Sequence, residues 1–577
     1  MPLSSHDQQR KPVQPNSKFE KLAKLTLVAM VSLLTLPGPF AIAQTENGLS
    51  AEQNQRLNQI ATRDVPKDAP GIATGLVLDG KIIYSKCAGL EDITNQSAIT
   101  PQSRFNIASN GKQFTALAII QLEAAGKLSY QDDIRTFFPK LFGNIPSPIT
   151  IEHLLTHTSG IRDVYRLWSL QGLTWWKNEF DNDDVMTLLE QQEALNFAPG
   201  TQFLYSNSNY ILLAEIVNQV SGTTFIDYTN EMFQQLGMPN TSFENDHTNI
   251  RGPVARPYFN FNTWQGYRWT WNVCGDGSLF STLEDQLQWE CLVQGHGTSK
   301  FDRELIKRSQ QLVNPALTKT YGFGLEFANQ GTVKSKFHEG ATGAWKAYIL
   351  RIPDENLSVI TLTNSGKVSP APQTLKLAEA FLNRVIDSRS FAIRPSSTGP
   401  RVTAEEILGT YRTDNGFAFQ FIQTDGQLFL RRSGRNDVLL ERESANVFHQ
   451  KTDPNFKQEF VRTVGDCWQV TAYHNSHPPY QLTQSKIDLT EFDADSIVGS
   501  YFNSETNSVI EVTHDKDRNF SLVLGKRKRK AQLVSFNKLV SGDYVIQWPG
   551  ESKKQPYLSL SNDRIMNVQF KRKPTDQ

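Results

Sequence analysis

The stretch FNIASNGKQFTALAII, residues 105–120, places a serine three residues ahead of a lysine at the start of an apolar segment. If the segment is helical from Ser109 onward, Ser109 and Lys112 lie on one face, one turn apart. A serine hydroxyl is a weak nucleophile at neutral pH, and a lysine one turn away can serve as its base. The residues after Lys112 are apolar nearly all round, which is typical of a buried helix and lowers the pKa of the lysine. Taken alone, the S-x-x-K pattern also fits an ordinary amphipathic helix start.

The length and charge of the chain limit its class. With 577 residues it is too long for one hydrophobic core, so we expect two to four domains. Lys and Arg balance Asp and Glu at 59 each, and this gives no reason to expect nucleic-acid partners. A hydrophobic content of 38% with 10% aromatic residues fits a globular protein rather than a disordered one.

Residues 1–43 have the pattern of a secretory signal peptide. Basic residues precede an apolar run over 25–36, and the sequence Ala-Ile-Ala at 41–43 offers an A-x-A cleavage site. We expect cleavage before Gln44 and a periplasmic or secreted mature chain without a transmembrane segment. The alternative is an uncleaved anchor, for which the apolar run is short.

The next motif, ITIEHLLTHTSGI at 149–161, contains two histidines one helical turn apart. Thr150 is a plausible helix cap, and His153 and His157 stand at i and i+4. Leu154 occupies the place of the glutamate in an H-E-x-x-H zinc motif, and no third ligand is evident. We therefore expect structural histidines, and no metal or cofactor.

The stretch FAPGTQFLYSNSNYILLAEIV, residues 197–217, contains a Y-x-N triplet before a helix that we expect to begin near Tyr210. In an extended segment Tyr205 and Asn207 point to the same side. A phenol near an ammonium can lose its proton more easily and act as a base. The amide can orient a substrate carbonyl and the lysine together. By itself the triplet is weak evidence.

Further segments contain candidate site residues or predicted strands and helices. The segment KFHEGATGAWKAYILRI, residues 336–352, is expected to form strand, turn and strand, with His338 at a strand edge and Gly340 allowing a ligand to approach the backbone. An aromatic group (Tyr165, Trp168, Trp175 and Trp176) fits either a pocket wall or internal packing. The segment YGFGLEF at 321–327 is expected to be a strand, and GDGSLFSTLEDQLQW at 275–289 a glycine-rich turn followed by a helix.

Four stretches in this order, FNIASNGKQFTA, TIEHLLTHTSGI, FAPGTQFLYSNSNY and FHEGATGAW, resemble the penicillin-recognising serine hydrolases. That superfamily includes class C β-lactamases, DD-peptidases, D-aminopeptidases and related esterases. The resemblance covers roughly residues 70–385. It implies an α+β fold (an α/β sandwich), in which an antiparallel sheet is flanked by helices and carries an all-α insertion.

The resemblance also implies catalytic roles. Ser109 would be the acylated nucleophile, Lys112 and Tyr205 would exchange its proton, and Asn207 would hold the substrate amide. Gly111, inside the first turn, costs helix propensity and is expected to admit substrate.

The third family motif, K-T-G, appears here as His338, Glu339 and Gly340. The N–H groups of Ser109 and Ala341 would form the oxyanion hole. A histidine supplies at best a partial positive charge at neutral pH, so we expect slow or absent β-lactam hydrolysis. The H-x-G form looks more like D-aminopeptidase and esterase branches.

The C-terminal third changes character after a linker at 393–401. Two stretches, around Gly409-Thr410-Tyr411 and Gly499-Ser500-Tyr501, look alike and are each followed by an alternating hairpin. We interpret them as two small antiparallel β-barrels or sheets, residues 402–487 and 488–577, which follow the hydrolase domain at 44–392. They resemble the lipocalin-like barrels of secreted serine hydrolases.

Two smaller features have open interpretations. The basic run KRKRK at 526–530 fits either contact with anionic envelope polymers or, preferably, a solvated hairpin. The four cysteines (Cys87, Cys274, Cys291 and Cys467) match no zinc or redox motif and are expected to be free, with one bridge as the alternative.

These observations predict an exported serine hydrolase that cleaves an amide or ester bond through a Ser109 acyl-enzyme. Its substrate would be a D-amino-acid peptide or amide, or a small ester. The alternatives are a β-lactamase or DD-carboxypeptidase, and a non-catalytic penicillin- or cell-wall-binding sensor. The leaving group, the stereochemistry and the oligomeric state stay open.

Overall fold

The computed structural model describes residues 48–574 apart from 175–176, 331–332, 387–398, 414–417, 433–436, 452, 464–466, 475–476, 486–491, 517–518 and 551–553. The predicted signal peptide at 1–43, Trp175 and Trp176, and most of the predicted linker therefore lie outside the described residues. Within the described part of the chain, no helix is long and apolar enough to cross a membrane.

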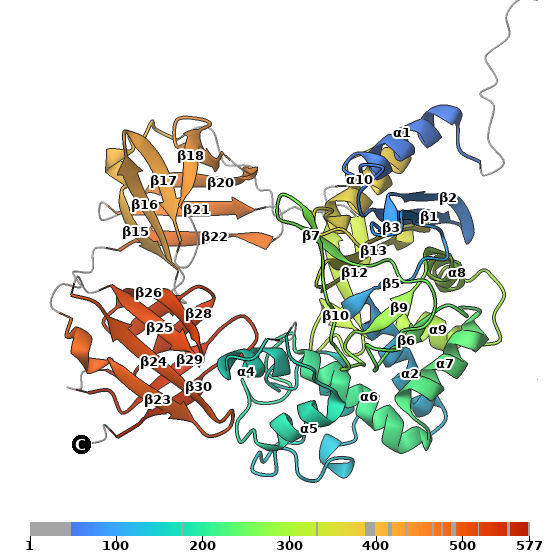
Figure 1. The fold of residues 1–577 in the computed structure, drawn as a ribbon, viewed down its shortest axis with the longest axis horizontal. Helices are drawn as coiled ribbons and strands as arrows, with labels where there is room; N and C mark the ends of the chain where they lie inside the picture. Colours follow the sequence, from blue (N-terminus) through green and yellow to red (C-terminus); the bar gives the residue numbers. More distant parts are fainter. Residues whose placement is uncertain are drawn as a thin grey trace, which may run out of the picture. The chain divides into compact units, whose positions relative to one another are not determined.

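A seven-stranded antiparallel sheet forms the centre of the N-terminal part, in the order β10-β11-β12-β13-β14-β1-β2 (Figure 1). Its strands are β1 (Ile72–Leu78), β2 (Lys81–Ala88), β10 (Tyr321–Gly322), β11 (Leu325–Gln330), β12 (Val333–Thr342), β13 (Trp345–Ile352) and β14 (Leu357–Thr363). The β1–β2 hairpin turns at Asp79 and Gly80, which both have positive φ, as the sequence Asp-Gly predicts.

The prediction of a single strand at 321–327 is wrong, because the segment contains two strands, β10 and the start of β11. Phe323 and Gly324 turn the chain with positive φ between the two strands. A Cβ on Gly324 would lie 2.4 Å from the Gln113 nitrogen, so this turn packs directly on the backbone of the helix that carries Lys112. The chain turns here because the backbone of the adjacent helix is so close that only glycine, which has no side chain, fits at position 324.

Helices cover both faces of the sheet (Figure 1). The first and last helices pack on one face over an apolar core, and the others face the second, larger core. The helices outside the insertion are α1 (Ala51–Thr62), α2 (Lys112–Ala124), α8 (Leu283–Val293), α9 (Arg303–Ser309) and α10 (Pro370–Leu382). Helix α2 is apolar all round and almost wholly buried, as its sequence indicates.

The helical insertion runs between α2 and α8. It consists of α3 (Ile151–Leu155), α4 (Val164–Leu170), α5 (Asn182–Glu190), α6 (Asn207–Ser221) and α7 (Phe225–Leu236). Thr150 caps α3 as predicted, and the ring of His153 completes the capping box. His157 is fully buried, and no group of residues in the described chain can hold a metal ion.

Short elements connect these layers. They are β3 (Leu90–Asp92), β4 (Ser97–Ala98), β5 (Phe105–Asn106), β6 (Ser242–Phe243), β7 (Tyr258–Asn260), β8 (Trp264–Gly266), β9 (Leu279–Ser281), and the 3₁₀ turns η1 (Ala108–Gly111), η2 (Ile134–Thr136) and η3 (Pro353–Glu355). The small sheet β5-β9-β6 leads the chain into η1.

Two closed eight-stranded antiparallel barrels follow, which confirms the predicted fold class. Barrel 1 contains β15 (Gly409–Arg412), β16 (Ala418–Thr424), β17 (Gln427–Arg431), β18 (Val438–Arg442), β19 (Val447–Gln450), β20 (Asp453–Arg462), β21 (Trp468–His474) and β22 (His477–Gln484). Barrel 2 contains β23 (Gly499–Asn503), β24 (Ser508–His514), β25 (Phe520–Leu524), β26 (Arg527–Ser535), β27 (Lys538–Ser541), β28 (Tyr544–Gln547), β29 (Tyr557–Ser561) and β30 (Val568–Arg572). The turns η4 (Glu405–Ile407) and η5 (Ala494–Ser496) precede the two barrels.

The tyrosine of each repeated glycine-x-tyrosine motif makes the same contact in its barrel. Tyr411 is fully buried and donates its hydroxyl proton to the carbonyl of Ile407, 3.0 Å away. Tyr501 makes the equivalent bond to Ile497, at 2.9 Å. Each glycine-x-tyrosine motif thus ties the first strand of its barrel to the turn before it.

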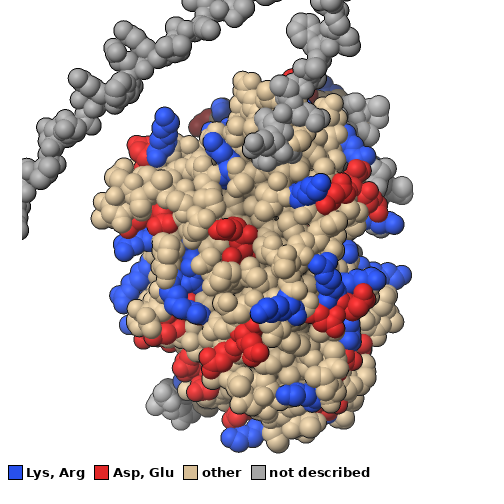
Figure 2. All heavy atoms as spheres, turned by 90° about the vertical axis from the view of Figure 1, so that its right-hand side faces the viewer, with Lys and Arg blue, Asp and Glu red and all other residues tan. Residues whose placement is uncertain are grey.

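The charged side chains and the cysteines are placed as the sequence led us to expect. Figure 2 shows basic and acidic side chains interspersed over one face of the molecule. Residues of the basic run 526–530 form the turn and the start of β26, a hairpin as we preferred. All four cysteines are free, with Cys274 and Cys291 buried and Cys87 and Cys467 half-buried.

Candidate active site

Ser109 lies in the 3₁₀ turn η1, directly before α2. The preceding residue, Ala108, has φ 49°, in the left-handed region that residues with a side chain rarely adopt, and its N–H donates to Asn106 Oδ1 at 2.9 Å. A single helix from Ser109 onward is therefore not formed, because the chain turns tightly into α2. The predicted pairing of Ser109 with Lys112 nevertheless occurs, with Nζ 3.0 Å from Oγ.

Lys112, the first residue of α2, is fully buried behind Ser109. Its ammonium also donates to Asn207 Oδ1 at 2.9 Å and to the backbone carbonyl of Asp276. Burial lowers the pKa of Lys112 to about 8, the Asp276 carboxylate opposes that shift, and the Arg564 guanidinium adds to it. The amine is thus available as a base not far above neutral pH.

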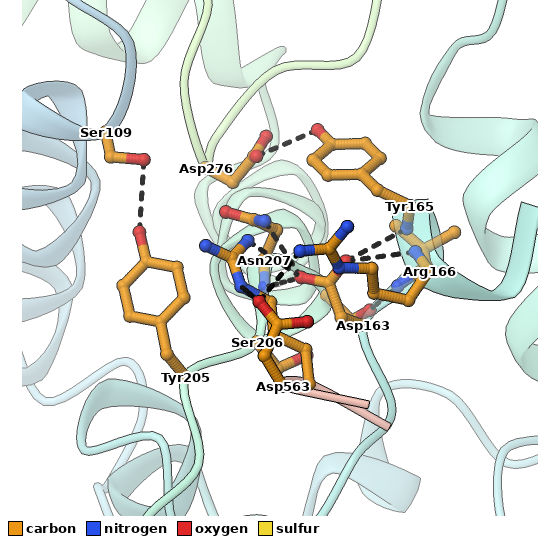
Figure 3. A network of polar contacts seen from close by, with 12 residues as sticks. Ser109, Asp163, Tyr165, Arg166, Tyr205, Ser206, Asn207, Asp276 and Asp563 are labelled. Atoms are coloured by element: carbon orange, nitrogen blue, oxygen red, sulfur yellow. Dashed lines mark hydrogen bonds and ion pairs between the residues drawn. The ribbon is translucent and has the colours of Figure 1, made fainter. Parts of the chain in front are cut away.

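Tyr205 approaches Ser109 from the other side. Its hydroxyl donates to Ser109 Oγ at 3.0 Å (Figure 3). Burial raises the pKa of Tyr205 well above its usual range, although Ser109 and Arg564 act in the opposite direction. The expectation that the phenol loses its proton more easily is therefore wrong, because desolvation raises the pKa of Tyr205 by more than the Arg564 charge lowers it. Tyr205 stays protonated and can donate, whereas Lys112 can accept.

Asn207 positions the lysine. It is the first residue of α6, so the helix begins three residues earlier than predicted and Asn207 is not in an extended segment. Its Oδ1 accepts from Lys112, while its Nδ2 and backbone N–H both donate to Asp163 Oδ2, at 2.8 and 2.9 Å. Both the oxygen and the nitrogen of the Asn207 amide are hydrogen-bonded within the protein. The predicted contact of Asn207 with a substrate amide stays a prediction.

Asp163 is a site residue that the sequence reasoning missed. It is fully buried and caps α4, with its second oxygen accepting from the N–H groups of Tyr165 and Arg166. Its carboxylate therefore links the start of α4 to the start of α6 (Figure 3). An aspartate directly before the apolar segment VYRLWSL is an N-cap signal, but nothing local indicates its second partner.

Asp276, in the Gly-Asp-Gly-Ser turn, was also missed. Its Oδ2 accepts from the Tyr165 hydroxyl at 2.8 Å (Figure 3), and its buried Oδ1 has no hydrogen-bond partner in the described chain. Burial raises the pKa of Asp276, and the charge of Lys112 opposes that shift. The signal that could have found it is a carboxylate flanked by two glycines ahead of a helix, α8, which Thr282 caps.

The third motif lies at the end of β12. His338 is 2% exposed, donates through Nδ1 to the Glu339 carbonyl at 2.7 Å, and lies 3.2 Å from the Tyr321 hydroxyl through Nε2. Burial, together with the charge of Lys112, lowers the pKa of His338 to about 3. The imidazole is therefore neutral at physiological pH and carries not even the partial charge that the sequence suggested.

The glycines near Ser109 have packing roles. A Cβ on Gly340 would lie 2.0 Å from the Ile107 carbonyl oxygen, so β12 touches the backbone just before Ser109. The close approach that Gly340 permits is to the chain itself. Gly111 is buried, and a Cβ there would lie 3.0 Å from Leu279 Cβ, so this position is filled by packing and does not admit substrate.

Ser109 opens into a cleft with a volume of about 600 Å³. The lining includes Ala341 and His338 on β12, Asn207 and Tyr205, and the aromatic side chains of Tyr165 and Trp271. Trp168 instead stacks on Phe180 with ring centroids 4.0 Å apart. Of the predicted aromatic group, Tyr165 thus forms a wall and Trp168 packs internally.

Two charged residues of the lining have no sequence signal. Glu326 on β11 has no hydrogen bond or ion pair within the described residues, and burial raises its pKa to about 7. Arg564 comes from the turn between β29 and β30 of barrel 2, about 450 positions after Ser109 in the printed sequence.

Comparison with known proteins agrees with this architecture. The protein-family model described as Beta-lactamase matches residues 57–382, more than half of the chain. The chain belongs to the β-lactamase family. This places it in the superfamily of penicillin-recognising serine hydrolases, as its motifs predicted.

Within the β-lactamase family, the relatives include D-aminopeptidases. That of Brucella anthropi is 28% identical over 317 residues, which are 52% of this chain and 58% of the relative. That of Brucella ovis is 28% identical over 326 residues, 54% of this chain and 60% of the relative. The chain thus spans about three fifths of the length of the curated relatives it matches.

A solved structure supports the fold alone. The octameric penicillin-binding protein homologue from Pyrococcus abyssi superposes with a TM-score of 0.52 at 23% identity, over 75% of this chain and 99% of that one. The β-lactamase-family match ends before both barrels, so barrel 2 and its Arg564 lie outside it.

Proposed function

We propose that this protein is an exported serine hydrolase that cleaves an amide or ester bond through an acyl-enzyme on Ser109. The observation that carries the proposal is the position of Ser109 Oγ, 3.0 Å from the Lys112 amine and 3.0 Å from the Tyr205 hydroxyl. A nucleophile held between a group that can accept a proton and one that can donate it is the arrangement that acyl transfer requires.

Acylation follows from these contacts. The neutral Lys112 amine takes the Ser109 proton as Oγ attacks the substrate carbonyl carbon, and the carbonyl oxygen becomes an oxyanion. The N–H groups of Ser109 and Ala341, which both line the cleft, stabilise this charge. When the intermediate collapses, the bond to the leaving group breaks and the leaving atom takes the proton of Tyr205. Tyr205 is then reprotonated by Lys112.

Deacylation reverses the sequence with water. A water molecule attacks the ester carbon and gives its proton to Lys112, and Ser109 Oγ leaves with a proton returned through Tyr205. The products are the free acid and the original enzyme. The amide of Asn207 holds Lys112 in place through both steps.

D-amino-acid peptides or amides, together with small esters, are the substrates that we propose. The D-aminopeptidase relatives favour the first class. The carboxylate of Glu326, which has no partner among the described residues, can accept hydrogen bonds from the ammonium of an aminoacyl group in the cleft. Glu326→Gln should then raise KM about tenfold for a D-aminoacyl amide and little for its N-acetyl analogue, because the lost charge-assisted bond is absent from the analogue.

Ser109→Ala tests the proposal. It should abolish both the hydrolysis of an activated ester such as p-nitrophenyl acetate and the labelling of the protein by a fluorophosphonate. Ser129→Ala, which changes an exposed serine outside the cleft, is the matched control. Full ester hydrolysis by purified Ser109→Ala would refute the proposal.

The alternatives remain distinguishable. A β-lactamase or DD-carboxypeptidase is less favoured, because the neutral His338 stands where the family lysine carries a charge; rapid nitrocefin turnover would favour it. Labelling of Ser109 without turnover of any amide, ester or β-lactam would favour a penicillin- or cell-wall-binding sensor.

A further inference from the structure

A turn of barrel 2, residues 562–566, forms part of the wall of the active-site cleft. The turn is held through its backbone: Asn196 Nδ2 donates to the Arg564 carbonyl at 3.2 Å, and the Met566 N–H donates to Asn196 Oδ1 at 2.7 Å. Ile565 is fully buried in the same core as the helical insertion. The backbone of Arg564 is thus fixed beside the cleft without help from its side chain.

The Arg564 guanidinium lies over the ring of Tyr205, with Cζ 4.9 Å from the ring centroid, and its side chain is 33% exposed. The closest carboxylate oxygens are Asp163 Oδ2 at 3.7 Å and Asp563 Oδ2 at 3.8 Å. Both distances exceed those of hydrogen bonds. Among the described residues, the guanidinium therefore has two charged neighbours and no hydrogen-bond acceptor.

Both carboxylates already have closer donors. Asp163 Oδ2 accepts twice from Asn207, and Asp563 Oδ2 accepts from Arg166 Nη2 at 2.7 Å (Figure 3). Arg166, the other arginine of the lining, is therefore committed to barrel 2, whereas Arg564 keeps its N–H donors available. A planar guanidinium with free donors in a cleft matches a carboxylate in charge and in geometry.

We propose that Arg564 is a specificity-determining residue that binds a carboxylate on the leaving group of the substrate. The inference rests on the acyl transfer proposed above. The leaving-group side is indicated because Tyr205 is the proton donor to the leaving atom and Arg564 lies against the same ring. When the last peptide bond of a peptide is cleaved, the C-terminal residue is the leaving group, and it carries a carboxylate. Barrel 2 is then a part of the active site.

Three esters, tested on the full-length protein, distinguish binding of a carboxylate on the leaving group from binding of a carboxylate on the acyl group. The acetyl esters of 3-hydroxybenzoate and 3-hydroxybenzamide share their acyl group and differ in the charge of the leaving group. The succinyl ester of 3-hydroxybenzamide carries the carboxylate on the acyl side instead. The readout is the ratio of kcat/KM between each charged ester and the neutral one, which cancels effects of a variant on the chemistry common to both.

Arg564→Ala should lower the ratio for the 3-hydroxybenzoate ester about 10- to 100-fold, the loss expected for charge-assisted hydrogen bonds in a cleft. Arg564→Lys should retain part of the ratio, because the charge stays and the paired donors are lost. Lys571→Ala removes an exposed positive charge from the neighbouring strand β30 and should leave the ratio unchanged.

The outcomes decide between the two proposals. An unchanged ratio in Arg564→Ala would overturn the inference, and so would a loss confined to the succinyl ester. If Ser109→Ala hydrolyses neither acetyl ester and Arg564→Ala leaves the ratio unchanged, the hydrolase proposal holds and the inference about Arg564 fails. If the wild type cleaves no ester, the hydrolase proposal fails, and calorimetric binding of 3-hydroxybenzoate against 3-hydroxybenzamide still decides the role of Arg564.

Discussion

Ser109 lies between two side chains whose pKa values move in opposite directions for one reason. Burial disfavours the charged form of each group, so it lowers the pKa of Lys112 and raises that of Tyr205. Above about pH 8 the result is a base and an acid on either side of one hydroxyl. The division of roles thus follows from desolvation of the site.

The pH dependence of acylation should report Lys112. Because the neutral amine is the base and its pKa is about 8, the acylation rate should rise with pH and level off above about pH 8. Asp276→Asn removes a negative charge that raises this pKa, so the midpoint should fall; Arg564→Ala removes a positive charge that lowers it, so the midpoint should rise. Stopped-flow acylation by an activated ester between pH 6 and 10 measures both shifts. A midpoint that neither variant moves would contradict the assignment.

At the scale of elements, β12 lies directly against the turn that carries Ser109. Gly340→Ala would place a Cβ 2.0 Å from the Ile107 carbonyl oxygen, which is a backbone atom and not the end of a flexible side chain. We expect a loss of about 1–3 kcal/mol in the free energy of unfolding, typical of overpacking in a rigid core, and slower acylation because η1 shifts.

Urea unfolding and ester hydrolysis check this prediction. Gly143→Ala is the matched control, since a Cβ there meets no atom within 4 Å. Equal stability of the two variants would show that β12 can move away from η1 without cost.

Local sequence patterns predicted the elements well. Asp79-Gly80 specified the β1–β2 hairpin, Thr150 the cap of α3, and the glycine-x-tyrosine repeat the two barrels, because each signal lies within a few residues of the feature it determines. The spacing of Ser109 and Lys112 likewise predicted their contact. The contributions of Asp163, Glu326 and Arg564 were not predictable in this way, since their partners come from distant parts of the chain and from packing that no short pattern records.

At the scale of the whole molecule, barrel 2 is joined to the helical insertion by a buried ion pair. Arg162 is paired with Glu505, and their side chains are 3% and 14% exposed. Gln171 and Gln192 add hydrogen bonds to the carbonyls of Thr506 and Glu505 at 2.7 and 2.9 Å. Barrel 2 is therefore fixed where its turn meets the cleft.

Glu505→Gln should weaken this attachment. It leaves the Arg162 charge buried without its partner, and we expect a loss of about 3 kcal/mol in stability, together with reduced kcat/KM because residues 562–566 are held less firmly. Differential scanning calorimetry and ester hydrolysis measure the two effects. Glu511→Gln, an exposed glutamate of the same barrel, should change neither. A Glu505→Gln protein as stable and active as the wild type would show that the attachment does not depend on the ion pair.

The turn that carries Arg564 has a consequence for how such an enzyme changes over evolution. Ser109, Lys112 and Tyr205 lie in the β-lactamase-family part, whereas residues 562–566 belong to the second copy of a repeated barrel. Under the proposed role of Arg564, a mutation in that turn alters which leaving groups are accepted and acts on Ser109, Lys112 and Tyr205 only through the charge that shifts the pKa of Lys112. Substrate range can therefore be modified in one segment of the gene while the residues proposed to carry out the chemistry stay in another.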